Sequence, residues 1–246
     1  MKVRLDQLLC DSKLAPSLET ARGMIGAGQV LVDDRIADKP GFLYHNTASI
    51  RLKERCPYVS RGGLKLEKGL THFNIDPENW TCIDIGASTG GFTDCLLQHN
   101  ALKVYAIDVA YGQLSWKIRQ NAKVVVLERF NARNISIKDI DRQEIDLAVM
   151  DVSFISITTL LPPLVRLFNQ KAKILSLIKP QFELPRDEVG AGGVVTDPAL
   201  HQKAIKKILQ CVEGLDLISM GIVPSPILGP KGNREFLILI TSRPPS

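Results

Sequence analysis

The stretch Asp84–Asp94, DIGASTGGFTD, constrains the fold of this chain more than any other part of the sequence. The apolar run Trp80–Ile85 leads into it and predicts a short buried strand, and Phe92–Leu97 predicts the first turns of a helix. A glycine-rich bend between a strand and a helix lets the backbone come close to a ligand and directs free N–H groups towards it. The stretch therefore predicts an α/β fold with a ligand at this junction.

The ligand is not the one expected of the two best-known glycine loops. A P-loop needs a Lys-Ser/Thr pair after its second glycine, where Phe92 follows Gly91, and a dinucleotide fingerprint needs glycine where Ser88 stands. Asp84 is expected to face the ligand, which suits a cation, and Asp108 ends the next strand, where such folds bind ribose hydroxyls. Together these residues favour S-adenosyl-L-methionine. The alternative is an ordinary strand–helix turn.

From Trp80 onward the sequence alternates between strand and helix patterns, and most strand patterns are nearly continuous apolar runs, as in parallel strands covered on both faces. The strands are expected at residues 80–85, 103–108, 123–127, 145–151, 173–178, 215–223 and 235–241. No helix pattern separates the last two, so we expect them to pair antiparallel. The fold class is therefore α/β, with a Rossmann-like, seven-stranded mixed sheet whose last strand is antiparallel.

Residues 1 to about 56 form a separate small α+β pattern. Two short helices, the second capped by Ser17, precede a hairpin at residues 30–37 and a strand at residues 49–52. So small a domain has few residues for chemistry, which favours a binding module. The stretch from residue 51 to residue 68, which spans the end of this pattern, is basic. It contains Arg51, Lys53, Arg55, Arg61, Lys65 and Lys68 against Glu54 and Glu67. It suits a phosphate backbone; the alternative is a solvated linker.

Composition narrows the class of protein. The 246 residues carry a net charge of +5, which implies no basic field over the whole molecule. The five cysteines and four histidines are scattered, so we expect neither disulfides nor a metal site, and free thiols fit a reducing cytoplasm. The N-terminus lacks the apolar region of a signal peptide. The apolar stretch Leu147–Val165 contains Asp151 and two prolines, which favours a buried strand and a core helix over a membrane span.

Four charged residues far apart in the sequence are expected to converge. In open α/β sheets, ligands bind outside the carboxyl ends of the strands. Asp151 ends the fourth predicted strand, Lys179 ends the fifth, and Glu235 begins the reversed last strand. Lys65, in a helix before the first strand, can reach the same edge. The alternatives are an exposed helix lysine for Lys65 and, for Glu235, an ion pair with a basic neighbour in the chain.

The first domain resembles the S-four-like RNA-binding fold first seen in a small-subunit ribosomal protein. The matching positions are Arg4-Leu5-Asp6, Ser17, Ala21, Ile25, Gly28-Gln29-Val30, Val32 and Lys39-Pro40. One departure is Leu18, where the family often has arginine. The resemblance implies RNA binding, and the residues expected to contact RNA are Arg4, Ser17, Arg22, Lys39 and Arg61.

The sequence as a whole resembles the TlyA family, whose members are known both as haemolysin A and as rRNA 2′-O-methyltransferases. The resemblance rests on the motifs VSRGGLKL from Val59, DIGASTGGFTD from Asp84, DVAYGQL from Asp108, MDVSFI from Met150, LIKPQFE from Leu177 and GPKGNREF from Gly229. It implies an S-four-like domain at residues 1–59, a hinge at 60–64 and an FtsJ-type class I methyltransferase domain at 65–246.

The resemblance also implies a catalytic tetrad of Lys65, Asp151, Lys179 and Glu235, and methyl transfer from S-adenosyl-L-methionine to a cytidine ribose in ribosomal RNA. The residues expected around the methyl donor are Asp84, Gly86, Ala87, Ser88, Gly90, Gly91, Phe92, Asp108 and Asp151.

The chemistry of a ribose 2′-hydroxyl agrees with that tetrad. The enzyme must align oxygen, methyl carbon and sulfur and must accept one proton. A lysine accepts a proton only when neutral, so the pKa of the base must fall from about 10.4 towards neutrality. We therefore assign Lys179 as the base, Lys65 to the positioning of the hydroxyl, and Asp151 and Glu235 to the orientation of the amines.

Two other functions stay open at the level of sequence: a pore-forming haemolysin, and an RNA-binding ribosome-assembly factor with an inert tetrad. The expected partner is ribosomal RNA or a ribosomal subunit in the cytoplasm, with no membrane involved; the sequence indicates no oligomeric state. Residues 184–196 contain Gly190, Gly192 and Gly193 and show no core pattern. We expect them to form a mobile edge of the RNA cleft, the alternative being a long surface loop.

Overall fold

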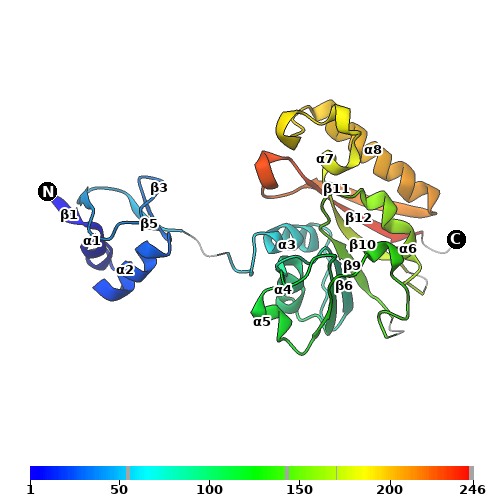
Figure 1. Ribbon diagram of the computed structural model, residues 1–246, viewed down its shortest axis with the longest axis horizontal. Helices are drawn as coiled ribbons and strands as arrows, with labels where there is room; N and C mark the ends of the chain where they lie inside the picture. Colours follow the sequence, from blue (N-terminus) through cyan, green and yellow to red (C-terminus); the bar gives the residue numbers. More distant parts are fainter. Residues whose placement is uncertain (54–55, 142–143, 170, 244–246) are drawn as a thin grey trace. The chain divides into compact units, whose positions relative to one another are not determined.

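The computed structural model describes residues 1–53, 56–141, 144–169 and 171–243 (Figure 1). The chain divides into two compact units, residues 1–55 and 56–246, and each has its own hydrophobic core. Glu54 and Arg55, two charged residues of the predicted basic segment, lie outside the described residues. Residues 60–64, the predicted hinge, lie within the second unit. The domain limits themselves stay a prediction.

The first unit combines two helices with short strands. Its elements are β1 (Lys2–Arg4), α1 (Leu5–Asp11), α2 (Leu18–Gly26), β2 (Val30–Val32), β3 (Arg35–Ile36), β4 (Leu43–His45) and β5 (Ile50–Leu52). Strand β2 lies between β3 and β5 in one antiparallel sheet, and β1 pairs with β4 in another. Helix α2 begins at the predicted cap, because the Ser17 hydroxyl accepts the Thr20 N–H at 3.2 Å.

Within the described part of the second unit, seven strands form one sheet. They are β6 (Thr81–Ile85), β7 (Lys103–Ile107), β8 (Val124–Leu127), β9 (Leu147–Met150), β10 (Lys173–Ile178), β11 (Leu217–Pro224) and β12 (Phe236–Ser242). Their order is β11-β12-β10-β9-β6-β7-β8. Strand β12 is antiparallel to β10 and β11, and the other pairs are parallel. The predicted seven-stranded mixed sheet is confirmed.

Helices cover both faces of this sheet. They are α3 (Gly62–His72), α4 (Gly91–Gln98), α5 (Trp116–Arg119), α6 (Leu161–Val165), α7 (Pro180–Glu183) and α8 (Pro198–Gly214). One core cluster joins α3 and α4 to the sheet, and another joins α6 and α8 to its opposite face. Successive residues of β9 show the alternation: Val149 belongs to the first cluster and Met150 to the second. The sheet is therefore buried on both faces, as its apolar strands predict.

The reversed strand β12 brings its first residues to the carboxyl end of β10. In the register of this pair, Phe236 lies opposite Ile178, so Glu235 and Lys179 follow at the same edge of the sheet. The connection from β11 to β12 contains one short 3-10 turn, η5 (Pro230–Gly232). The antiparallel pairing therefore places a residue from the start of a strand among residues from strand ends.

The apolar stretch Leu147–Val165 divides into β9, the 3-10 turn η2 (Ile157–Thr159) and α6. The predicted strand followed by a core helix is confirmed, because Leu161 and Leu164 of α6 belong to the core. Across the described residues, every helix is too short or too polar to cross a membrane.

The segment 184–196 contains two 3-10 turns, η3 (Arg186–Glu188) and η4 (Ala191–Gly193). Its second half is bonded to the β11–β12 connection. The Asn233 side chain accepts the Val195 N–H at 2.9 Å and donates to the Gly193 carbonyl at 2.9 Å, and Lys231 Nζ donates to the Gly192 carbonyl at 2.8 Å. The mobility predicted for this segment stays a prediction, and these bonds are what such motion must break.

Candidate active site

The bend between β6 and α4 brings two strand ends together. Gly86 has a φ of +81°, and a Cβ there would lie 2.7 Å from the Asp151 carbonyl oxygen, so only glycine fits. The Asp151 N–H donates to the Ile85 carbonyl at 3.0 Å. Gly90 is the left-handed residue that precedes α4 and lines neither of the cavities described below. The bend therefore places its open backbone next to the residue that follows β9.

Asp108, directly after β7, holds the bend from the other side. Its Oδ2 accepts the Ser88 N–H and its Oδ1 accepts the Ala110 N–H, both at 2.8 Å. A cavity of about 360 Å³ opens between this carboxylate and the segment after β9. Its apolar walls include Ile85, Ile107, Phe130, Val152 and Leu160. A polar group thus stands at the rim of an apolar cavity of nucleoside size.

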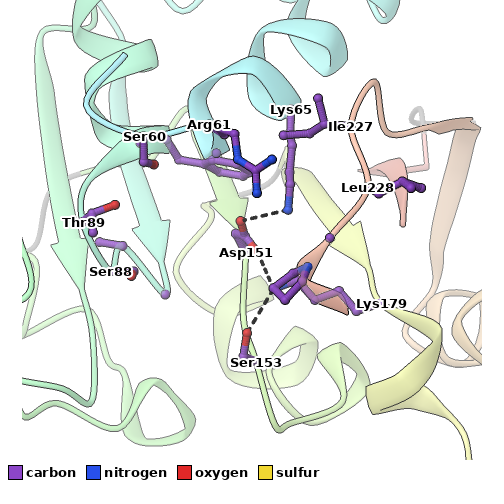
Figure 2. Close-up of a pocket in the computed structure, with 17 residues that line it drawn as sticks. Ser60, Arg61, Lys65, Ser88, Thr89, Asp151, Ser153, Lys179, Ile227 and Leu228 are labelled. Atoms are coloured by element: carbon purple, nitrogen blue, oxygen red, sulfur yellow. Dashed lines mark hydrogen bonds and ion pairs between the residues drawn. The ribbon is translucent and has the colours of Figure 1, made fainter. Parts of the chain in front are cut away.

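A second cavity, of about 290 Å³, adjoins the first (Figure 2). The residues that line both are Gly86, Ser88, Asp151 and Ser153. Lys65, Lys179 and the exposed Arg61 line only the second cavity. The residues predicted around a methyl donor that line at least one cavity are Gly86, Ala87, Ser88, Gly91, Phe92, Asp108 and Asp151.

Four charged side chains alternate in sign along the second cavity. Lys65 Nζ, from α3, donates to Glu235 Oε2 at 2.6 Å and lies 3.9 Å from Asp151 Oδ2. Lys179 Nζ lies 2.5 Å from Asp151 Oδ1 and donates to Ser153 Oγ at 3.1 Å. Figure 2 shows both amines pointing towards Asp151 from opposite sides. The structure therefore brings together the four residues that were expected to converge.

Burial distinguishes this chain of charges from surface ion pairs. Lys65 and Lys179 are each 7% exposed and Glu235 is 2% exposed. Because an unpaired buried charge is costly, each ammonium depends on its carboxylate. Lys65 is therefore not an exposed helix lysine, and Glu235 pairs with Lys65 rather than with a basic neighbour in the chain.

Asp84 is the candidate that lies elsewhere than expected. It does not face either cavity; it is fully buried below the bend, where its Oδ2 accepts the Thr93 hydroxyl of α4 at 2.6 Å. Side chains alternate along a strand, and at position 84 the side chain points to the face that α4 covers. Burial raises the pKa of Asp84 to about 7, with the Thr93 hydrogen bond opposing the rise and Asp151 adding to it. The carboxyl group supports the bend from below.

Three residues of this edge were not among the predicted site residues. Ser153 binds Lys179, and Phe154 beside it has a φ of +64° and is 91% exposed. The third is Gly229, where a Cβ would collide with Glu235 Oε1. A hydroxyl two residues after a strand-end aspartate was a usable signal for Ser153. Nothing local in the sequence indicates that Gly229 covers a carboxylate.

The residues predicted to contact RNA in the first unit are partly engaged within it. Arg4 and Arg22 both bind the buried Asp6, with nitrogen–oxygen distances of 2.8 and 3.0 Å. The Arg4 guanidinium, aided by Arg22, holds the pKa of Asp6 well below its usual range. Ser17 caps α2, and Lys39 is exposed. Contacts of these residues with RNA stay a prediction.

The two cavities fit S-adenosyl-L-methionine in their shape and charge. The larger one offers apolar walls for a base, and Asp108 at its rim has oxygens suited to ribose hydroxyls. Asp151 lines both cavities and suits a cationic centre between them. The missing Cβ at Gly86 leaves the backbone open at this point.

Known proteins match both units. A family model described as FtsJ-like methyltransferase matches residues 58–241, and one described as S4 domain matches residues 3–46. The "16S/23S rRNA (cytidine-2′-O)-methyltransferase TlyA" of Mycobacterium tuberculosis is 41% identical over 98% of this chain and 91% of its own length.

Two further matches carry another name. "Hemolysin A" of Brachyspira hyodysenteriae is 43% identical over 96% of this chain and 98% of its own. The solved structure of a hemolysin candidate from Streptococcus thermophilus is 39% identical, with a TM-score of 0.76, over 98% of this chain and 88% of that one. Close relatives thus bear names that describe two different activities.

Proposed function

This chain belongs to the TlyA family of FtsJ-like methyltransferases, and from this premise we propose that it methylates the ribose 2′-hydroxyl of a cytidine in ribosomal RNA, with S-adenosyl-L-methionine as donor. The observation that carries the proposal is the buried series Glu235, Lys65, Asp151 and Lys179 beside the two cavities. These residues would supply one amine to orient the ribose hydroxyl and a second amine to accept its proton.

The donor is assigned to the larger cavity and to the part that both cavities share. Asp108 would hold the ribose hydroxyls, and the backbone from Gly86 to Ser88 would approach the rest of the molecule. When bound, S-adenosyl-L-methionine supplies an electrophilic methyl group on a positively charged sulfur. Asp151, at the junction of the cavities, lies where its charge stabilises such a cation.

Lys179 is assigned as the proton acceptor. Its Nζ lies against Asp151 and Ser153 at the second cavity, and a lysine amine accepts a proton only in its neutral form. Ser153 then keeps the neutral amine directed towards the second cavity, because a hydroxyl can also donate a hydrogen bond to an amine.

Lys65 is assigned to the positioning of the ribose hydroxyl. Its hydrogen bond to Glu235 and its position 3.9 Å from Asp151 hold the side chain in place. Glu235 binds Lys65 and does not line the cavity. Gly229 lines the cavity instead and lies directly against the Glu235 carboxylate. A fixed ammonium can therefore donate to the hydroxyl oxygen while Lys179 takes the proton.

Recognition of the RNA is assigned to the S4 unit and to the cavity rim. Arg4, Arg22 and Lys39 are exposed on the first unit, and Arg61 is exposed at the second cavity. Phe154 adds an aromatic surface, with its ring centroid 5.1 Å from that of Phe182. Cationic side chains bind phosphates and aromatic faces stack on bases, so this rim suits a single-stranded or extruded nucleotide.

A methyl-transfer assay tests the proposal. With labelled donor and ribosomal RNA or subunits, wild type should transfer label, and Lys179→Ala should lower the rate by about 100-fold or more, the scale of general-base catalysis. Donor affinity should stay within a few-fold, since Lys179 lies beyond the larger cavity. Lys138→Ala is the control, because Lys138 is an exposed lysine that lines neither cavity.

The methyl-transfer assay, together with assays of RNA binding and of red-cell lysis, separates the other two functions. An RNA-binding assembly factor predicts RNA binding without label transfer. A haemolysin predicts lysis of red cells that persists when Lys179 is replaced. Near-wild-type transfer by Lys179→Ala contradicts the assignment of the base.

A further inference from the structure

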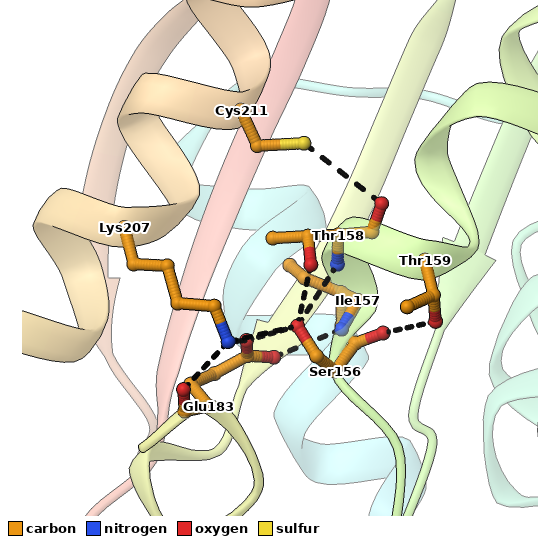
Figure 3. A network of polar contacts seen from close by, with 7 residues as sticks. All are labelled: Ser156, Ile157, Thr158, Thr159, Glu183, Lys207 and Cys211. Carbon is orange, nitrogen blue, oxygen red and sulfur yellow. Dashed lines mark hydrogen bonds and ion pairs between the residues drawn. The ribbon is translucent and has the colours of Figure 1, made fainter. Parts of the chain in front are cut away.

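A buried carboxylate that the tetrad does not include joins two segments of the active site. Glu183, the last residue of α7, is 2% exposed. Its Oε1 accepts the Ile157 N–H at 2.9 Å, and its Oε2 accepts the Ser156 hydroxyl (Figure 3). One segment carries Lys179, four residues before Glu183, and the other is the loop that follows Asp151.

The main chain of that loop makes few hydrogen bonds, although Val152 and Ile157 belong to the core and Ile155 packs against it. The Asp151 N–H is bonded to β6 and the Ile157 N–H is bonded to Glu183, whereas among the described residues the N–H groups of residues 152–156 donate no hydrogen bond. The loop carries Ser153, which binds Lys179, and Phe154, whose φ of +64° is strained for an aromatic residue. At its far end, Glu183 accepts both the Ile157 N–H and the Ser156 hydroxyl and so joins the loop to α7.

A cation from α8 completes the junction. Lys207 Nζ donates to the Glu183 main-chain carbonyl at 2.6 Å and lies 3.5 Å from Oε2 and 3.4 Å from the Ser156 hydroxyl. The Ser156 hydroxyl also contacts Thr158 Oγ1 at 2.7 Å. Glu183 thus accepts from or lies close to three donors. These donors explain why a buried position, which an apolar residue usually occupies, holds a carboxylate here.

We propose that Glu183 is a positioning residue for methyl transfer: it fixes the loop after Asp151 to the helix after Lys179 and so sets the Lys179–Ser153 contact. The inference rests on the proposed function for the identity of the reaction, but the geometry it concerns exists in the free protein. Loss of the Glu183 side chain should release the loop end, Ser153 should leave Lys179, and the amine should become less ordered.

Two readouts separate positioning from a merely structural role. The first is the rate of Lys179 acetylation in the native protein, followed by mass spectrometry; it needs neither donor nor RNA. Glu183→Ala should raise it by about threefold or more, as local opening exposes the amine. The second is single-turnover methyl transfer, which should fall by about tenfold to a hundredfold because the reacting groups are displaced.

The conservative variant should restore both readouts. Glu183→Gln keeps an oxygen for the Ile157 N–H and an amide that can bind the Ser156 hydroxyl, so both rates should return to near those of wild type. Ser156→Ala removes one of the two bonds that join Glu183 to the loop and leaves the bond from the Ile157 N–H, so both readouts should shift in the same direction by less. This variant decides the matter if Glu183→Ala does not fold.

Asp146→Ala is the matched control. Asp146 Oδ2 also accepts a main-chain N–H, that of Thr81 at 2.8 Å, but at the opposite end of β6. The inference is overturned if Glu183→Ala and Ser156→Ala have the same rates of Lys179 acetylation and of methyl transfer as Asp146→Ala. If wild type transfers no methyl while Glu183→Ala still changes the labelling, the proposed function fails and the positioning inference stands.

Discussion

The two buried lysines of the site differ in how they are held. Lys65 has two carboxylates around it, whereas Lys179 has one carboxylate and a hydroxyl. Removing one partner of a buried ion pair costs about 3–5 kcal/mol, because the other charge is left unpaired. Substitution of Lys65 or Glu235 therefore lowers stability as well as rate. Lys179 is the cleaner position for testing chemistry, because its partner Asp151 still has Lys65 at 3.9 Å.

At Gly229 we predict that the addition of a single methyl group slows catalysis. In Gly229→Ala the new Cβ would collide with Glu235 Oε1 and displace the carboxylate that holds Lys65. Methyl transfer should fall by about tenfold or more, on the scale of a displaced reacting group, while the protein stays folded. Single-turnover rates and circular dichroism measure the two effects. Gly214→Ala, where the added Cβ meets open space, is the control; equal rates for the two variants would contradict the prediction.

At Asp84 we predict a pH dependence of stability. Its pKa is raised to about 7 in the fold from 3.8, so the folded protein binds this proton more tightly than the unfolded chain does. The contribution to stability is complete below about pH 4 and is lost as the pH rises through about 7. Asp84→Asn has no such proton, so its melting temperature should fall less between about pH 5 and pH 8.

Thermal denaturation of both proteins across this range checks the Asp84 prediction. The other titrating groups are common to the two proteins, so the difference between the two curves isolates Asp84. Parallel curves of melting temperature against pH for wild type and Asp84→Asn would show that the Asp84 carboxyl group does not cause the pH dependence.

At the scale of elements, strand ends and the loops after them make the site. The alternation of strands and helices was enough to predict the sheet, because near-continuous apolar runs identify buried parallel strands. The missing helix before β12 was enough to predict its reversal, and with it the approach of Glu235 to Lys179. The sheet and the reversal of β12 depend on the direction of the main chain, and this direction can be predicted from patterns along the sequence.

Side-chain direction and pairings between distant short segments could not be predicted in this way. Strands β1 and β4 have three residues each and pair Lys2 with His45, so no local pattern marks them. The Asp84 side chain points below the bend although Asp84 lies near the end of its strand. The alternation of side chains along β6 places it on the face that α4 covers. The cover of Glu235 by Gly229 depends on a loop whose path the sequence does not encode locally.

We predict that Asn233 fastens the segment 190–195 to the β11–β12 connection. Asn233→Ala removes the acceptor of the Val195 N–H and the donor to the Gly193 carbonyl. Amide exchange at Val195 should become faster, because an opened loop exposes its N–H to water. Hydrogen exchange of the full chain measures this. Asn121→Ala, which removes a similar contact to the Lys123 N–H at a remote turn, should leave Val195 unchanged; equal exchange in wild type and Asn233→Ala contradicts the prediction.

At the scale of the whole molecule, we assign the chemistry to the second unit alone and the binding of RNA to both units. The first unit has a core of its own around Leu5, Leu9 and Ile25, and the second has separate clusters on the two faces of its sheet. A small unit with few core residues depends more on individual polar contacts than a large one does. The buried Asp6, held by Arg4 and Arg22, is such a contact.

We predict that Asp6→Asn loosens the first unit alone. The pKa of Asp6 is lowered by its arginine partners, so its contribution to stability is present above about pH 4 and is lost as the pH falls below that value. At neutral pH the variant should show faster amide exchange in residues 1–53 and unchanged exchange in the second unit. Mass spectrometry of the intact chain measures both. Faster exchange throughout the chain would show that the units do not unfold separately.

The central claim is that Lys179 and its partners deliver a methyl group to a cytidine ribose in ribosomal RNA. Mapping 2′-O-methylated riboses in ribosomal RNA treated with wild type, with Lys179→Ala and with no protein tests it most directly. The account predicts a cytidine 2′-O-methyl mark made by wild type and by neither of the others. A mark made equally by Lys179→Ala, or a methyl group on a base instead of a ribose, would contradict it.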